Sequence, residues 1–172
     1  MTADGTPTKV LMEEHQQVLK KLSAMEGLLG KLGQKDEIST ELKGLAYFFK
    51  KDFWLHFDKE DSALFPELGN YIPRNAGPLQ MMFIEHEDLR NTNEVFQHAL
   101  ADYFEDKDMS ITRETIRKAG MSFIRSLRSH IDKENGMMFT LANAHLTKEQ
   151  EDDIMRVFAQ IDAMRENQPA KS

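Results

Sequence analysis

Two short motifs occur twice in this chain, with histidine and glutamate at matching places. HFDKED at residues 56–61 returns as HIDKEN at 130–135, and EEHQ at 13–16 returns as IEHE at 84–87. In all four places the polar residues fall on apolar rows spaced by three or four residues, which is the period of an amphipathic helix. The repetition therefore predicts a helical hairpin that is used twice.

The apolar period and the turn residues predict five helices. We expect them over 8–32, over 40–64, after Pro78, over 111–144 and from the capping box Thr147–Gln150 onward. Between them, connections rich in turn-forming or charged residues are expected at 33–40, 68–78 and 105–110.

Four helices of this length with such connections form an up-down-up-down bundle. The sequence thus predicts an all-α fold, a four-helix bundle with an additional C-terminal helix. One domain is expected over residues 8–165, between flexible tails at 1–7 and 166–172.

Polar residues interrupt the rows that face the core of this predicted bundle. On the fourth helix, for example, the inward row is predicted to be Ile116, Gly120, Phe123, Leu127, His130, Glu134, Met137 and Leu141. Six inward residues are histidines or glutamates near the middle of their helices: His15, His56, Glu60, His86, His130 and Glu134. A buried carboxylate without a partner is strongly unfavourable, and two that face each other are worse.

A pair of metal cations removes this penalty, because carboxylates neutralise the charge and neutral imidazoles donate nitrogen lone pairs. His and Glu four residues apart lie on one helix face, so His56/Glu60 and His130/Glu134 each aim two ligands at the bundle axis. Six ligands are too many for one tetrahedral ion and fit two ions bridged by the glutamates. Nitrogen and oxygen ligands without sulfur favour iron, with manganese as the alternative.

Composition excludes several other classes of protein. The chain has no cysteine, which removes disulfides, thiolate zinc sites and iron–sulfur ligation. A net charge of −7 without a basic cluster argues against nucleic acid as a partner. No apolar run approaches the ~20 residues that span a membrane, and the first residues do not resemble a signal peptide. A cytoplasmic protein without a membrane partner is therefore expected.

The repeated motifs resemble those of the hemerythrin-like (HHE cation-binding) domain family. The resemblance rests on EEH at 13–15, HFDKE at 56–60, LFPEL at 64–68, EH at 85–86 and HIDKEN at 130–135. It implies the bundle described above, with two non-haem irons held by the six inward residues.

The chain departs from the oxygen-carrying hemerythrins at two places. Their fifth histidine would fall at Arg90, and their final HxxxxD is replaced by HxxxE at His130–Glu134. The resemblance is therefore to the symmetric type, with two histidines on each iron and both glutamates bridging, as in bacterial di-iron proteins of iron–sulfur centre repair and stress response. With an oxo or hydroxo bridge, each iron would keep one position open for dioxygen, nitric oxide or peroxide.

Three functional classes follow from this resemblance. The first is a protein that binds or reacts with these small ligands in oxidative or nitrosative stress or in iron homeostasis. The second is an iron or oxygen sensor that acts through a protein partner, and the third is an iron store or donor. The sequence shows no second cofactor motif, so whether the protein is an enzyme is left open.

Several other residues have two readings. Glu14 and Glu85 each precede an inward histidine and are either surface residues or hydrogen-bond partners of an imidazole. The charged residues between the histidine and glutamate of each HxxxE motif are expected on a solvated face: Asp58, Lys59, Asp132 and Lys133. His98 and His145 are not expected to bind metal.

The second helix is apolar almost all round, and either the C-terminal helix or a homodimer partner is expected to cover its outer side.

Overall fold

The computed structural model describes residues 5–105, 107 and 110–166, and these residues form helices and turns. The α-helices are α1 (Pro7–Leu29), α2 (Lys35–Tyr47), α3 (Trp54–Lys59), α4 (Phe65–Leu68), α5 (Gly77–Phe104), α6 (Ser110–Lys133), α7 (Phe139–His145) and α8 (Lys148–Glu166). Three π-helical turns lie between them: η1 (Phe48–Asp52), η2 (Glu60–Leu64) and η3 (Glu134–Met138). Of the predicted tails, residues 1–4 and 167–172 lie outside the described residues, whereas Pro7 and Glu166 belong to α1 and α8.

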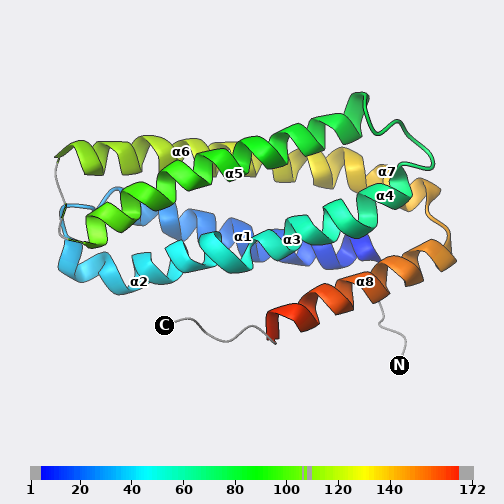
Figure 1. Ribbon diagram of the computed structural model, residues 1–172, viewed down its shortest axis with the longest axis horizontal. Coiled ribbons are helices and arrows are strands. Elements are labelled where there is room, and N and C mark those ends of the chain that lie inside the picture. The colour runs from blue at the N-terminus through cyan, green and yellow to red at the C-terminus, as the bar shows by residue number, and fades with distance from the viewer. Residues whose placement is uncertain (1–4, 106, 108–109, 167–172) are drawn as a thin grey trace.

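Two antiparallel hairpins make up the bundle (Figure 1). The first pairs α1 with the continuous helical run α2–η1–α3–η2–α4, and the second pairs α5 with α6–η3–α7. α8 lies beside the first hairpin, where it contacts α1, α3 and η2. The predicted all-α bundle with an additional C-terminal helix is thus confirmed.

The second helix begins earlier than the sequence predicted. α2 starts at Lys35, whereas residues 33–40 were expected to form a loop. Asp36 and Glu37 lie in its first turn, where negative side chains interact favourably with the helix dipole. Those polar residues were read as a connection, although their charge also suits a helix N-terminus.

The π-helical turns change which residues face the core. The backbone N–H of Phe65 donates to the carbonyl of Glu60, and that of Phe139 donates to the carbonyl of Glu134, each across five residues. The extra residue rotates the helix, so Met138, Phe139 and Ala142 are buried after Glu134. The prediction that Met137 and Leu141 continue the inward row is therefore wrong, because it assumed an α-helical period.

The buried apolar side chains form two clusters, one toward each end of the bundle. One extends from Val18 in α1 to Ile131 in α6 and includes most of the phenylalanines. The other contains Leu11, the residues around η2 and η3, and Ile154 and Phe158 from α8. The six inward histidines and glutamates lie between these clusters along every helix of the bundle, so the polar layer sits at the boundary of two apolar cores.

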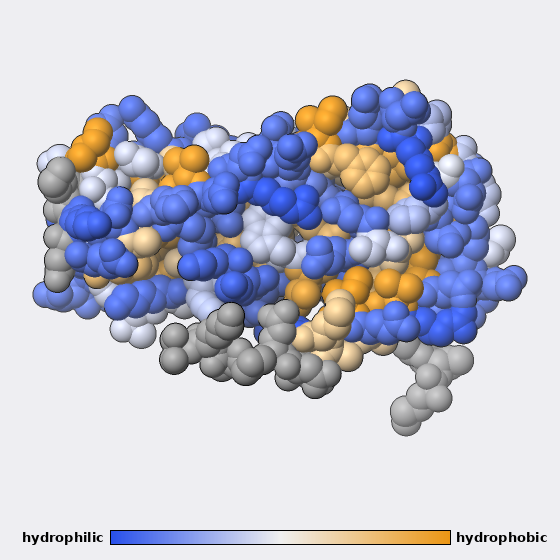
Figure 2. Space-filling view, viewed as in Figure 1, coloured by the Kyte–Doolittle hydropathy of each residue, from blue (hydrophilic) through white to orange (hydrophobic). Residues whose placement is uncertain are grey.

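α8 covers part of the outer side of the second helical run. Ile154, Phe158 and Ile161 are buried there, while Met164 on the same helix is exposed. The C-terminal helix therefore covers the part of that side formed by α3 and η2. Figure 2 shows that the face with α5 and α8 is mostly hydrophilic, with separate hydrophobic patches mainly toward the α4 and α8 end. Among the described residues, no helix is long and apolar enough to cross a membrane.

We expect Phe158→Ala to lower the free energy of unfolding by about 3–5 kcal/mol, because its buried ring links α8 to the second cluster. Met164→Ala is the matched control on the same helix and should change the stability by less than about 0.5 kcal/mol. Urea unfolding followed by circular dichroism measures both. Equal, small effects would mean that α8 does not depend on this contact.

Candidate metal centre

Four helical runs bring the six predicted side chains together near the middle of the bundle. His15 comes from α1, His56 and Glu60 from the α3–η2 boundary, His86 from α5, and His130 and Glu134 from the α6–η3 boundary. None of the six residues is more than 4% exposed, and both glutamates are fully buried. Each glutamate is the first residue of a π-helical turn, a feature often found at functional sites.

The six residues form two overlapping groups of four. His15, His56, Glu60 and Glu134 place one nitrogen or oxygen atom each within 4.8 Å of one another, and so do Glu60, His86, His130 and Glu134. Both groups contain both glutamates. The Nε2 atoms of His56 and His86 lie 2.6 and 3.1 Å from the two different oxygens of Glu60. Glu60 therefore faces one histidine of each group.

Most polar atoms at the centre have no hydrogen-bond partner among the described residues. These atoms are Nε2 of His15 and His56 and both carboxylate oxygens of Glu60 and Glu134. They lie close together, as in the 3.2 Å contact from His15 Nε2 to Glu134 Oε2, but without hydrogen-bond geometry. Buried polar groups are nearly always paired, and lone pairs that converge in this way are the arrangement of metal ligands. The donor set fits a pair of cations.

Without a metal, the pKa values of the two buried carboxyl groups shift in opposite directions. Burial, together with the nearby Glu134 carboxylate, raises the pKa of Glu60 well above its usual value. Burial opposes ionisation of Glu134 too, but the imidazoles around it, that of His130 first, hold its pKa well below the usual value. Burial also works against the charged form of His86, yet its carboxyl neighbours, Asp61 first, raise its pKa to about 10. Cations would take the place of these protons.

The outer nitrogen of two histidines contacts a glutamate from the adjacent helix. His56 Nδ1 lies 3.2 Å from Glu14 Oε1, and His130 Nδ1 lies 2.7 Å from Glu85 Oε2. A carboxylate can only accept, so each Nδ1–H donates and each Nε2 keeps its lone pair toward the centre. Glu14 and Glu85 are therefore partners of imidazoles, although each serves a histidine on the helix next to its own.

A lysine holds each of these glutamates. Lys59 Nζ donates to Glu14 Oε2 at 2.8 Å and lies 2.9 Å from Asp162 on α8, and Lys133 pairs with Glu85. Lys59 is only 4% exposed, so the expectation that it lies on a solvated face is wrong. A residue three positions after an inward histidine lies about 60° from it round the helix, still close to the core. Asp58 and Asp132 are exposed as expected.

The sequence reasoning missed the partners of the other two histidines. His86 Nδ1 lies 2.9 Å from Asp61 Oδ1, and His15 Nδ1 lies 2.8 Å from Asn135 Oδ1. Each partner directly follows a central glutamate and serves a histidine of the opposite hairpin. The repeated motif contained a signal for them, because HFDKED and HIDKEN end in Asp and Asn at the same register.

Aromatic rings from the two apolar cores pack directly against the imidazoles of the centre. The ring of Phe57 stacks on that of His86 with centroids 3.7 Å apart and planes 7° from parallel. Phe139 stacks on His15 at 5.4 Å, and Phe65 lies 5.7 Å from His86. Such stacking fixes the imidazole planes and keeps water from the inner nitrogen atoms.

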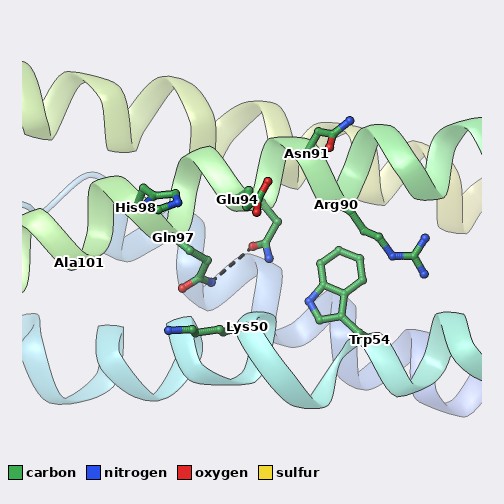
Figure 3. A pocket seen from close by; sticks show the side chains of 9 residues that line it. Lys50, Trp54, Arg90, Asn91, Glu94, Gln97, His98 and Ala101 are labelled. Atoms are coloured by element: carbon green, nitrogen blue, oxygen red, sulfur yellow. Dashed lines mark hydrogen bonds between the residues drawn. The ribbon is translucent and has the colours of Figure 1, made fainter.

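An open groove of about 650 Å³ lies between α5 and the η1–α3 segment, and none of the six central residues lines it (Figure 3). Arg90 and Trp54 face each other there, with the guanidinium 5.7 Å from the indole centroid. Arg90 also lies 5.8 Å from the Phe57 ring and 3.3 Å from Asp61 Oδ2. The position of the fifth histidine in oxygen carriers is thus occupied by a cation that contacts a partner of His86.

The remaining polar candidates lie away from the centre. His98 and His145 are exposed and belong to neither group of four, in agreement with the sequence prediction. The buried Asn93 donates to the carbonyl of Phe49 in η1 at 3.0 Å. Trp54 donates to the same carbonyl at 2.8 Å, so side chains satisfy a backbone oxygen of this π-helical turn.

Comparison with known proteins points the same way. A family model described as the hemerythrin HHE cation binding domain matches residues 6–142. The iron-sulfur cluster repair protein YtfE of Enterobacter sp. (strain 638) is similar to this chain, with 28% identity over 106 residues. That alignment covers 59% of this chain and 48% of the relative, so the chain matches about half of the relative's length.

Proposed function

Because the chain belongs to the hemerythrin HHE cation-binding domain family, we propose that its centre holds two non-haem irons and handles a small oxidant or nitric oxide. The observation that carries the proposal is the pair of overlapping ligand groups, buried between two apolar cores and with unpaired inner atoms. Manganese is the alternative metal.

Each residue has a distinct role in this proposal. His15 and His56 would hold one ion, His86 and His130 would hold the other, and Glu60 and Glu134, which belong to both groups of four, would serve both ions. When bound, the iron pair would supply redox chemistry toward dioxygen, nitric oxide or peroxide. The protein would exclude water with the phenylalanine rings and fix the imidazole tautomers through Glu14, Glu85, Asp61 and Asn135.

We also place the physiological role in oxidative or nitrosative stress or in iron homeostasis. The similarity to an iron-sulfur cluster repair protein supports this role, although it covers only part of either chain. The lack of cysteine means that this chain offers no thiolate of its own to an iron–sulfur cluster.

The test starts with metal analysis and an optical spectrum of protein purified without oxygen and supplied with ferrous iron. Two irons per chain are expected. Titration of the reduced protein with nitric oxide should then change the optical and EPR spectra. Spectra that do not respond, together with ready loss of iron to an apo acceptor protein, would instead indicate storage or donation. A protein that takes up no iron would overturn the proposal.

The partners of the imidazoles should tune metal affinity. We expect Glu85→Ala to weaken iron binding about 10- to 100-fold, because His130 loses the carboxylate that orients it and increases its basicity. Glu87→Ala, two residues further along α5 and exposed, is the matched control and should leave the affinity unchanged. Competition with a coloured ferrous chelator measures both. Equal affinities for the two variants would exclude this role for Glu85.

A further inference from the structure

The two hairpins supply nearly identical surroundings to the two halves of the centre. In both, a glutamate just before the first-helix histidine contacts the histidine of the HxxxE motif, and a lysine holds that glutamate. Glu14 and Glu85 therefore each lie between an imidazole and a lysine ammonium in the same arrangement.

The halves differ at one position of the repeat. Asp61 contacts His86, whereas Asn135, in the same register, contacts His15. A carboxylate accepts a stronger hydrogen bond from an imidazole N–H than a neutral amide oxygen does. It also makes the opposite imidazole nitrogen a better electron donor.

The surroundings of Asp61 and Asn135 also differ between the two halves of the centre. Arg90 Nη2 lies 3.3 Å from Asp61 Oδ2, and the guanidinium is held over the rings of Trp54 and Phe57. In the other half, the register of Arg90 is occupied by Leu19. One half of the centre thus combines a carboxylate with a cation, and the register of the other half has an amide and an apolar residue. The Arg90 guanidinium contacts Oδ2 of Asp61, so Oδ1 remains available to accept the hydrogen bond from His86.

We propose that the two metal positions are inequivalent and that Asp61 sets the difference. The position of His86 and His130, where both imidazoles contact a carboxylate, binds ferrous iron more tightly and fills first. The position of His15 and His56, where one imidazole contacts only an amide, fills second. This inference rests on the proposed function, because it presumes that both positions bind iron. The expected difference in affinity is about tenfold.

The test is anaerobic titration of metal-free protein with ⁵⁷Fe(II), followed by Mössbauer spectroscopy. With two equivalents, the unmodified protein should give two quadrupole doublets of equal area. With one equivalent, a tenfold difference in affinity places about three-quarters of the iron in one doublet. His15→Ala provides the reference spectrum of the position of His86 and His130, and its doublet should match the one that fills first.

Exchanging the two residues provides matched variants. Asp61→Asn and Asn135→Asp each give both halves the same partner, so the preference at one equivalent should disappear. The double exchange Asp61→Asn/Asn135→Asp should restore the preference, and the first doublet should then match the reference from His86→Ala. Since Asn135→Asp makes the surroundings alike without touching Asp61, the test remains decisive if Asp61→Asn folds poorly.

The outcomes separate this inference from the function on which it rests. Uptake of no iron overturns both. Two bound irons that give a single doublet, or equal areas at one equivalent, overturn the inequivalence and leave the iron centre standing. Two doublets whose order of filling is unchanged in Asp61→Asn and Asn135→Asp overturn the role of Asp61.

Discussion

Glu60→Gln should reduce bound iron from two per chain to well below one. Glu60 belongs to both groups of four, and its two oxygens face histidines of different groups. A neutral amide in this place bridges poorly and no longer balances the charge of the cations. The measurement is iron content per chain after anaerobic loading with ferrous iron and removal of excess metal.

Two control variants sharpen this prediction. His15→Ala removes a ligand from one group only, so about one iron per chain should remain. His98→Ala removes an exposed histidine beside the groove, and two irons should remain. Helical content and the unfolding midpoint of each metal-free variant show whether it has folded. If Glu60→Gln keeps two irons, or loses no more than His15→Ala, the glutamate does not bridge.

Glu60→Met should stabilise the metal-free protein and weaken the iron-loaded one relative to the unmodified chain. Without metal, the glutamate is fully buried beside a second carboxyl group, and its inner oxygens have no hydrogen-bond partner. Burial raises the pKa of Glu60 and so favours its uncharged form, which means that methionine replaces a buried polar group without hydrogen-bond partners and not one half of an ion pair. An unsatisfied buried polar group costs about 1–3 kcal/mol. We expect a gain within that range after removal of metal with a chelator.

With iron bound, the unmodified chain should be more stable than Glu60→Met. A ligand that binds only the folded state adds about 2.7 kcal/mol at one hundred times its dissociation constant, and the variant no longer receives this contribution. Urea unfolding, once with chelator and once with ferrous iron, measures the stability of each protein in both conditions. Glu13→Met, at an exposed position of α1, is the control and should change stability by less than about 0.5 kcal/mol in either condition. A metal-free Glu60→Met protein less stable than the original would mean that the glutamate has a structural role of its own.

The sequence predicted the fold and the six central residues because both depend on local periodicity. An apolar row with a period of three to four residues determines which face of a helix is buried, and a histidine or glutamate on that row must be buried with it. In α1 and α5, the rows with this period are buried from Leu11 to Leu29 and from Met82 to Leu100. That these six residues bind iron remains a prediction until metal is measured.

The limits of the prediction also have physical causes. A π-helical turn adds one residue to a helix, and the inward row was assigned with an α-helical period, so the residues after Glu134 were placed on the wrong face. The start of α2 was missed because charged residues suit a loop and a helix N-terminus equally well.

Which helix lies next to which is a property of the tertiary structure. The sequence by itself determined that two similar hairpins bury four histidines and two glutamates, since burial follows from the order of residues along each helix. Only packing decided that Glu14 reaches His56, that Asp61 reaches across to His86, and that Lys59 is covered from α8 by Asp162. These contacts join residues far apart in the chain, and the rotation and spacing of neighbouring helices place their atoms within hydrogen-bond distance.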